Sequence, residues 1–220
     1  TSVLKKTDPN IIFHYVELNK VLKDYLRKEG QWLLEKYRNW FGITSRKGIT
    51  VVILPKFRIE HGGYTRRGFV VLCPEENLDE DFFRYIAHEI AHLWWLNAPT
   101  DSWEDWLNES FAEYSALMAL REKWGNKTFQ KFIRRKSKKI QELPSIVGLR
   151  RDDENAYQVL YNKGPILLNK LESRIGKKEF LKILDESSAR KVKLTRGFLD
   201  ILGCISSAEN KEWFKKLLET

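Results

Sequence analysis

The sequence predicts an α+β fold, because short β-branched segments come early in the chain and long amphipathic segments follow them. Residues 49–54 read Ile-Thr-Val-Val-Ile-Leu and residues 69–72 read Phe-Val-Val-Leu, and both runs are typical of strands. Beyond them, apolar residues recur mostly at helical spacing. We therefore expect one domain over residues 1–220, with an α+β lobe over about 1–125 and a helical lobe over about 126–220.

The composition is that of a globular protein with a substantial hydrophobic core. Of the 220 residues, 42% are hydrophobic and 13% are aromatic, which excludes an intrinsically disordered chain. No apolar run reaches the roughly 18 residues that a membrane span needs, and no signal peptide is visible. We expect a cytoplasmic protein on these grounds. Because the chain begins at Thr1, an upstream targeting or membrane segment and further domains of a longer parent protein stay open.

The net charge of +9 comes from 39 Lys and Arg against 30 Asp and Glu, with both signs interspersed along the chain. This interspersion favours a solvated surface. The densest basic run lies within residues 131–139, where a nucleic-acid patch competes with the solvated face of an amphipathic helix. We favour the helix and expect no nucleic-acid partner. The two cysteines, Cys73 and Cys204, form no metal-spaced pair, and we expect reduced, buried thiols.

The first expected element is a helix near the N-terminus. Asp8 resembles an N-cap, and Pro9 suits the first helical position. Apolar residues then recur at helical spacing, at Ile12, Val16, Leu22 and Leu26. The pattern continues to Gly42, so we expect one long helix or two abutting helices that cover the sheet. His14 would then be a packed helix residue, whereas His61 lies in an expected loop.

Helices are expected through the rest of the chain. Residues 77–80 read Asn-Leu-Asp-Glu and fit a capping box, which opens a helix that should end near Pro99. Residues 102–105 open the next helix in the same way, and Gly125 is its expected C-terminal end. The remaining helices are expected over about residues 129–140, in a segment that ends at Gly176, and over about 179–186, 197–202 and 208–218.

Two histidines stand on the first of these helices, where residues 88–92 read His-Glu-Ile-Ala-His. Four residues apart on a helix, His88 and His92 share a face and can reach one metal ion. Glu89 lies one step round the helix, where its carboxylate can contact a water on that metal. A pair of hydrogen-bonded core histidines is the alternative, but it would bury costly polar groups beside two carboxylates.

The following helix supplies a carboxylate that can complete the site. A tetrahedral zinc site needs a third protein ligand and leaves its fourth position to water, and Glu109 is the obvious candidate. Glu113 lies one helical turn further on and shares its face. We expect Glu113 to accept the free N–H of a zinc-bound histidine, with a structural salt bridge as the alternative. A surface salt bridge is also the alternative role for Glu89 and Glu109.

Residues 88–95 (HEIAHLWW) and 106–114 (WLNESFAEY) together resemble the zinc-binding signature of the gluzincin metallopeptidases, in particular the aminopeptidase N and leukotriene hydrolase family. Three further stretches agree with this resemblance, in the family's order. The first is Trp40-Phe41-Gly42 followed by ITVVILPKF. The second is residues 62–70, which align with the family's G-x-M-E-N-x-G exopeptidase strand. The third is residues 161–164, which match its Y-x-K-G motif. The resemblance covers roughly residues 30 to 185.

The resemblance implies a thermolysin-like zinc peptidase catalytic domain that binds one Zn²⁺ ion and takes a peptide substrate. It implies that the metal ligands are His88, His92 and Glu109. Glu89 would be the general base and Tyr161 the donor to the oxyanion, with a packed aromatic as the alternative role for Tyr161. The substrate-binding residues that it implies are Gly62, Gly63, Tyr64, Thr65 and Arg66.

The sequence departs from the family pattern in two places. The stretch between His92 and Glu109 is shorter than the family usually has, although the ligand helices still flank it. Where the family has a glutamate that grips the substrate's free α-amine, this chain has Thr65, and the following Asn position is Arg66. Without that carboxylate, a cationic N-terminus loses its charge-assisted partner.

The sequence therefore predicts a zinc-dependent metallopeptidase that is aminopeptidase-like but lacks the usual amine-binding glutamate. Whether it cleaves from the N-terminus or within a chain stays open. The alternative is a non-catalytic, zinc-bearing module that holds a peptide or protein on the same fold, because a fold does not fix a function. The presence of Glu89 and Tyr161 argues against this alternative, since a non-catalytic site does not need them.

Overall fold

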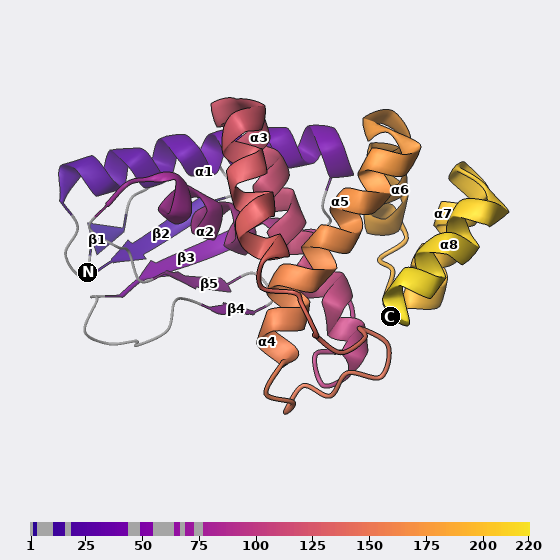
Figure 1. The fold of residues 1–220 in the computed structure, drawn as a ribbon. Helices are drawn as coiled ribbons and strands as arrows, with labels where there is room; N and C mark the ends of the chain where they lie inside the picture. Colours follow the sequence, from indigo (N-terminus) through magenta and orange to yellow (C-terminus); the bar gives the residue numbers. More distant parts are fainter. Residues whose placement is uncertain are drawn as a thin grey trace.

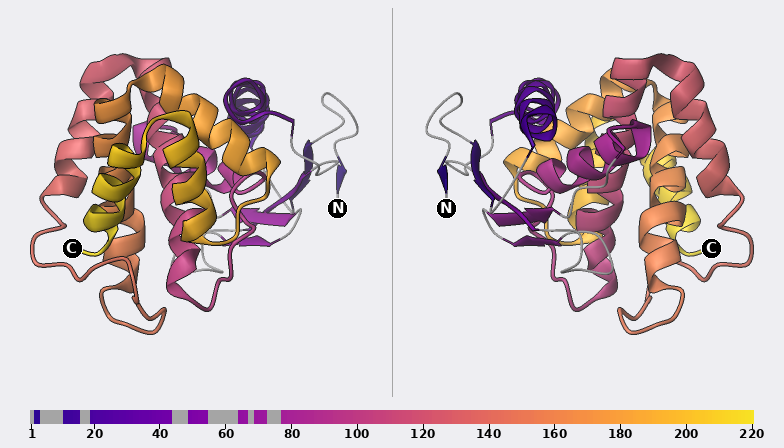
Figure 2. Two further views of the ribbon diagram at one scale, coloured as in Figure 1. Left: turned by 90° about the vertical axis from the view of Figure 1, so that its right-hand side faces the viewer. Right: turned by 90° about the vertical axis from the view of Figure 1, so that its left-hand side faces the viewer.

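The computed structural model describes residues 2–3, 11–15, 19–43, 49–54, 64–66, 69–72 and 77–220. Figure 1 shows a small sheet on one side of two central helices, α2 (Glu80–Ala91) and α3 (Trp106–Ser137), and a group of later helices on the other side. The N-terminal strand and the C-terminal helix lie at opposite sides of the molecule (Figure 2). Within the described part of the chain, no helix is long and apolar enough to cross a membrane.

The sheet is mixed and has five strands, in the order β1 (Ser2–Val3), β2 (Ile11–Tyr15), β3 (Ile49–Ile53), β5 (Phe69–Leu72) and β4 (Tyr64–Arg66). β2, β3 and β5 run parallel, whereas the outer strands β1 and β4 pair antiparallel to their neighbours. β3 and β5 are the two strands that the sequence predicts. Their apolar runs reflect the burial on both faces that is usual for parallel strands.

The predicted N-terminal helix is wrong in its first part, where Ile11–Tyr15 forms a strand. These residues are β-branched or aromatic, and pairing with β3 realises their strand preference. Helix α1 (Lys20–Phe41) begins only after Asn19, whose side chain accepts the Leu22 N–H at 2.8 Å. His14 is therefore a strand residue and not a helix residue. The proposed cap residues Asp8 and Pro9 lie outside the described residues, as do His61 and Cys73.

Helix α1 covers the sheet and is tied to α2 (Figure 1). It ends at Gly42, as predicted, and Gly42 has a φ of 73°. The Tyr37 hydroxyl donates to the Ala87 carbonyl at 3.0 Å, and the Trp94 indole donates to the Gly42 carbonyl at 2.9 Å. The buried face of α1 includes Leu26, Leu33, Leu34, Tyr37 and Phe41. These contacts fix α2 against the sheet layer.

Helix α2 begins two residues later and ends several residues earlier than the sequence suggests. Its N-cap is Asp79, two residues after Asn77, and its carboxylate accepts the N–H groups of Asp81 and Phe82, each at 3.0 Å. The helix stops at Ala91 and not near Pro99. The chain turns directly after it, because the Trp94 and Trp95 N–H groups both return to the Ala91 carbonyl and both indoles are buried.

Helix α3 follows a short 3₁₀ turn, η2 (Trp103–Asp105), which Ser102 caps as predicted. Gly125 breaks the helix with a φ of 80°, so the predicted end at this glycine and the separate helix beyond it are both confirmed. Before the break, nearly every side chain from Trp106 to Leu120 is buried. This half of α3 passes through the centre of the molecule, which is why it can carry buried polar groups of the site.

The C-terminal third is helical, as predicted. Its elements are α4 (Ala156–Gln158), a π-helical turn η3 (Val159–Lys163), α5 (Gly164–Ile175), α6 (Lys177–Ala189), α7 (Thr195–Ile205) and α8 (Ala208–Leu218). Glu104 accepts the N–H and the hydroxyl of Thr195, each at 2.6 Å, and so joins α7 to η2. The expectation of a buried Cys204 is wrong: α7 buries Phe198 and Leu202 and leaves this thiol exposed.

Candidate metal centre

His88 and His92 lie buried on one face of α2, with their Nε2 atoms 3.2 Å apart. The other ring nitrogen of each histidine has its own acceptor. Nδ1 of His88 lies 3.0 Å from Glu113 Oε2, and Nδ1 of His92 lies 2.8 Å from the Trp95 carbonyl oxygen. Because a carboxylate and a carbonyl only accept, each Nδ1 carries a hydrogen, so Nε2 is the nitrogen of each ring that can offer a lone pair to a metal.

Glu109 brings a third acceptor to the same point from α3. Its Oε2 lies 3.3 Å from His88 Nε2 and 3.6 Å from His92 Nε2. This oxygen is buried and makes no well-aligned hydrogen bond to any residue that the structure describes. Three electron-pair donors therefore face one another in a buried place, an arrangement that is unfavourable without a shared cation.

The spacing of these three donors fits zinc. Bonds of about 2.0–2.1 Å in a tetrahedron put neighbouring ligand atoms about 3.3–3.4 Å apart. The three separations are 3.2, 3.3 and 3.6 Å, so the preformed triangle has the right size. Two imidazoles and one carboxylate are also the donor types of catalytic zinc sites, which keep their fourth position open. Within the described residues this is the group of ligands that could hold a metal ion.

The electrostatic surroundings of the site favour a cation. Burial opposes the charged form of His88, but the close approach of the Glu109 and Glu113 carboxylates and the nearby charge of Glu89 outweigh it and raise its pKa to about 10. The same negative charges that attract a proton would attract a metal ion. Glu89 itself is 6% exposed on α2, and its charge raises the pKa of Tyr161 as well as that of His88.

Tyr161 reaches the site from the π-helical turn η3, which packs against α3. Its ring stacks on the His88 ring, with centroids 5.4 Å apart and planes at 22°. Burial, followed by the charge of Glu109 and a hydrogen bond to Glu109, raises the Tyr161 pKa well above its usual value. The phenol therefore keeps its hydrogen and can serve as a donor. Tyr157 also stacks on this ring, with centroids 4.5 Å apart, and 62% of Tyr157 is exposed.

The motif that carries Tyr161 also contains a packing requirement. A Cβ on Gly164 would lie 1.9 Å from the Ser110 hydroxyl, so only glycine lets α5 approach α3 this closely. Ser110 follows Glu109 directly and donates to the Leu160 carbonyl at 2.7 Å. The glycine of the motif therefore brings the Tyr161 turn against the helix that carries Glu109.

Glu113 has the predicted contact with His88 and two further partners that sequence reasoning missed. It is fully buried, and both its oxygens lie 2.7 Å from Arg84 Nη1 while Oε1 lies 2.6 Å from Lys136 Nζ. Burial alone would raise its pKa, but these cations hold the pKa well below the usual range. Glu113 is thus an ionised acceptor for His88 and also a member of a salt bridge.

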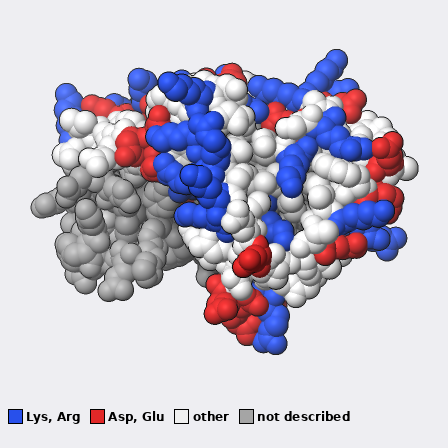
Figure 3. Space-filling model, viewed as in Figure 1, with Lys and Arg blue, Asp and Glu red and all other residues white. Residues whose placement is uncertain are grey.

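The expectation that the basic run 131–139 is a solvated face is wrong for Lys136, which is 8% exposed. The sequence held a signal for this: Phe129, Phe132 and Ile133 form an apolar stripe, and Lys136 falls at the next position of that stripe. Figure 3 shows the other Lys and Arg side chains of this helix as a stripe over α3. Among them, Lys131 pairs with Glu80 and Arg135 pairs with Asp81, both at exposed positions.

Asn108, which was not singled out from the sequence, holds the loop between the two ligand helices. Its amide accepts from the Ala98 N–H and donates to the Ala98 carbonyl, each at 3.1 Å. It also donates to Asp105 at 2.7 Å. Since Asn108 precedes Glu109, these bonds fix the shortened loop and the start of α3 relative to each other.

The implied substrate residues are only partly described. Gly62 and Gly63 lie outside the described residues. Tyr64, Thr65 and Arg66 form β4, the outer strand, with Thr65 opposite Val70 of β5. For these three residues the structure gives the backbone, and the placement of their side chains relative to the metal centre stays a prediction.

Comparison with known sequences places these features in a family. The Peptidase family M1 domain matches residues 33–212. The chain is 30% identical to aminopeptidase N of Streptomyces lividans over 153 residues, which cover 61% of this chain and 18% of that protein. It is 25% identical to leucyl aminopeptidase of Saccharolobus solfataricus over 211 residues, 83% of this chain and 27% of that protein. The chain spans less than a third of either relative.

Solved structures agree on the fold. An M1 zinc metallopeptidase from Deinococcus radiodurans matches 99% of this chain and 51% of its own, with a TM-score of 0.78 and 18% identity. Leukotriene A4 hydrolase from Saccharomyces cerevisiae matches 98% of this chain and 37% of its own, with a TM-score of 0.75 and 20% identity. The predicted α+β, thermolysin-like zinc peptidase fold is thereby confirmed. With the family domain covering most of its length, this chain belongs to peptidase family M1.

Proposed function

We propose that this chain is the catalytic domain of a zinc-dependent peptidase, with one zinc ion held by His88, His92 and Glu109. The observation that carries the proposal is the convergence of His88 Nε2, His92 Nε2 and Glu109 Oε2 at tetrahedral spacing in a buried place. We also propose that residues 1–220 form a single domain. The activity of the whole parent protein is part of the proposal, because the chain covers a minor share of its relatives.

The residues around the three ligands have matching roles in peptide hydrolysis. When bound, zinc supplies a water of lowered pKa and polarises the scissile carbonyl. Glu89 accepts the proton of the attacking water and passes it to the leaving amine. The Tyr161 hydroxyl, protonated because of its raised pKa, donates to the oxygen that becomes negative. Glu113 holds His88 in the tautomer that presents Nε2.

The substrate class that we propose is a peptide. Relatives of the chain are named aminopeptidases, and one structural neighbour, the E323A mutant of the Deinococcus radiodurans enzyme, is described as bound to a Tyr-Ser-Ala substrate. The family resemblance puts an amine-gripping glutamate where this chain has Thr65. We therefore propose that the amino end of the substrate is not held by a carboxylate of β4, and that Arg66 favours an acidic or carboxylate-bearing group there.

The test of the chemistry is Glu89→Gln. The amide cannot take a proton, so peptide hydrolysis should fall by about 10²–10⁴-fold while zinc stays bound at one ion per chain. Glu154→Gln, at an exposed glutamate, is the matched control and should hydrolyse like the wild-type protein. Metal content and turnover are measured on the same samples. Full activity of the Glu89→Gln protein would remove the proposal.

The test of the specificity compares one peptide series with free and with blocked N-termini, with and without a chelator. Chelator-sensitive cleavage of blocked peptides is expected if the Thr65 substitution has opened the site. In the Thr65→Glu variant, the rate of hydrolysis of peptides with free N-termini should rise relative to that of blocked peptides, because the new carboxylate can pair with the ammonium group. Cleavage of free N-termini alone by the wild-type chain would show that another group replaces the missing carboxylate.

A second candidate function is peptide binding without turnover, and the Thr65-Arg66 segment favours it. Under this alternative the wild-type chain retains an unblocked peptide intact, with zinc bound, over times at which a peptidase would turn over many substrates. Isothermal titration followed by mass spectrometry of the recovered peptide distinguishes the two functions.

A further inference from the structure

The turn that carries Tyr161 lacks two of the usual helical hydrogen-bond donors. In an α-helix each carbonyl accepts from the N–H four residues further on. For Tyr161 that residue is Pro165, which has no N–H. For Leu160 it is Gly164, whose N–H donates instead to the Val159 carbonyl in the π-helical turn. The two carbonyls next to the phenol are therefore open to donors from outside the helix.

Both carbonyls accept from side chains of α3. The Ser110 hydroxyl donates to the Leu160 carbonyl at 2.7 Å, and the Lys136 ammonium donates to the Tyr161 carbonyl at 2.6 Å. Ser110 sits beside Glu109, near the N-terminal end of α3, whereas Lys136 comes from its C-terminal end. The turn is thus held from two points, and Lys136 binds the main chain of the tyrosine itself.

Lys136 also contacts the group behind the histidine ligand. Its Nζ lies 2.6 Å from Glu113 Oε1, while the other oxygen of Glu113 accepts from His88 Nδ1 at 3.0 Å. A continuous chain of hydrogen bonds therefore runs from the Tyr161 carbonyl through Lys136 and Glu113 to His88. It joins the two sides of the metal centre, which belong to segments far apart in sequence.

Charge balance does not explain why a lysine is buried here. Arg84 already places its guanidinium 2.7 Å from both oxygens of Glu113, so one cation neutralises this carboxylate without Lys136. A second buried cation loses its hydration and is unfavourable unless further hydrogen bonds compensate for it. The bond to the Tyr161 carbonyl is such a contact, and it gives Lys136 a task that Arg84 does not share.

We propose that Lys136 is a positioning residue, which holds the Tyr161 turn at the metal centre by bridging the Tyr161 carbonyl to Glu113. The inference rests on the proposed function in so far as Tyr161 acts as the oxyanion donor. It assigns Lys136 no contact with substrate or zinc. Loss of the bridge should leave the zinc ligands in place and let the turn that carries the phenol move away from them.

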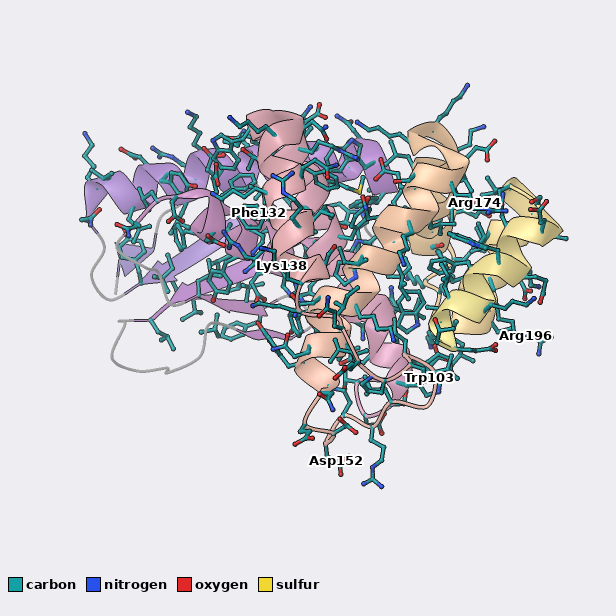
Figure 4. All side chains as sticks on the ribbon, viewed as in Figure 1. Trp103, Phe132, Lys138, Asp152, Arg174 and Arg196 are labelled. Atoms are coloured by element: carbon teal, nitrogen blue, oxygen red, sulfur yellow. The ribbon has the colours of Figure 1, made fainter. Side chains whose placement is uncertain are left out.

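The test variant is Lys136→Met, which keeps the length and the apolar stem of the side chain and removes its donors. The kcat for peptide hydrolysis should fall about 10- to 100-fold, less than the roughly 10²–10³-fold loss on removing an oxyanion donor outright. KM should change less than about threefold, since substrate contacts are untouched. Lys138→Met, two residues further on at the exposed position directly after the end of the same helix (Figure 4), is the matched control and should match wild type.

A double-mutant cycle separates positioning from general destabilisation. If Lys136 acts through the phenol, Lys136→Met should reduce kcat by less than about twofold once Tyr161→Phe has removed the hydroxyl. Additive losses in the double variant would overturn the proposal, because they would mean that Lys136 acts on catalysis by another route. If Lys136→Met does not fold, Lys136→Gln, which keeps a shorter donor, takes its place in the cycle.

A measurement without turnover tests the bridge separately from the proposed function. Amide hydrogen exchange in residues 159–166 should accelerate about tenfold in Lys136→Met, the effect of losing one strong hydrogen bond, and should not change in Lys138→Met. Zinc content should stay at the wild-type level in both variants. Unchanged exchange in this segment would refute the bridge, whereas an inactive wild-type protein with the accelerated exchange would refute only the proposed function.

Discussion

The two sides of the metal centre are built in different ways. On one side, His88, His92 and Glu109 come from α2 and the buried half of α3, and the two histidines sit at helical spacing on a single element. On the other side, Tyr161 comes from a π-helical turn whose carbonyls bind Ser110 and Lys136, residues 50 and 25 positions away. The ligand side follows from local helix geometry, whereas the phenol side depends on long-range contacts.

Because the two sides are built differently, substitutions on each side should affect different properties of the protein. On the ligand side, a substitution should change metal binding first and activity as a result. On the phenol side, it should change turnover while zinc stays bound. Within the ligand side the histidines also differ, because His88 donates to a buried carboxylate and His92 donates to a main-chain carbonyl that no substitution removes. His88 is therefore the proposed ligand that substitutions of neighbouring residues can perturb.

The largest effect is expected for Glu109→Ala, which removes one of the three proposed protein ligands. Stoichiometric zinc binding should be lost, and hydrolysis with it, because two histidines alone do not form the closed triangle of donors that the structure shows. Metal analysis after gel filtration in the absence of added zinc is the measurement. Glu154→Ala, at an exposed site, should keep its zinc. Zinc retained by Glu109→Ala at wild-type affinity would exclude Glu109 from the ligand set.

A smaller but still large effect is expected for Glu113→Gln. The amide leaves Arg84 and Lys136 without their buried counter-charge, which should lower the free energy of unfolding by about 3–5 kcal/mol. Zinc affinity should fall about 10–100-fold, as is usual when the partner of a ligating histidine is lost.

Glu172→Gln is the control for this prediction. Glu172 is also a buried carboxylate, paired with Arg121 at 2.6 Å and far along the chain from the ligands. The Glu172→Gln variant should be less stable than the wild-type protein but should bind zinc with the same affinity. Equal losses of zinc affinity in both variants would mean that Glu113 acts through general stability and not through His88.

On the phenol side, Gly164→Ala should lower stability by about 1–3 kcal/mol, because the new methyl group would lie 1.9 Å from the Ser110 hydroxyl and must push the turn away from α3. Turnover should fall while zinc remains bound. Gly197→Ala on α7 is the matched control: its Cβ would meet no atom closer than 3.5 Å, and the change should be neutral or slightly stabilising. The measurements are thermal unfolding, kcat and metal content of both variants. Loss of zinc from Gly164→Ala would contradict the prediction that substitutions on the phenol side change turnover while zinc stays bound.

The smallest effect is expected for Lys131→Met, on the same helix as Lys136. Lys131 pairs with Glu80 at 2.7 Å, but its side chain is 55% exposed, so the pair should contribute less than about 1 kcal/mol. The free energy of unfolding from chemical denaturation should lie within this margin of the wild-type value, and kcat should not change. A loss as large as that of Lys136→Met would mean that the basic face of α3 as a whole, and not the one buried lysine, supports the site.

The sequence predicted much of the fold because its signals are local. Hydrophobic periodicity, β-branched runs and glycines gave β3, β5, the break at Gly125 and the ends of α1 and α5 at Gly42 and Gly176. The error at Ile11–Tyr15 has a physical cause. The sequence of this segment suits either a helix or a strand. It forms a strand because it pairs with β3, which lies more than 30 residues further on in the chain.

The sequence by itself determined which side chains can hold the metal, because two histidines four residues apart on a helix must share a face and a carboxylate on the next helix can return to it. Only the tertiary structure decided what holds those side chains in place. Arg84 and Lys136 meet Glu113, and Gly164 admits Ser110, because α2, α3 and the Tyr161 turn are packed together. Contacts between segments tens of residues apart depend on how whole elements pack, and local spacing carries no record of that packing.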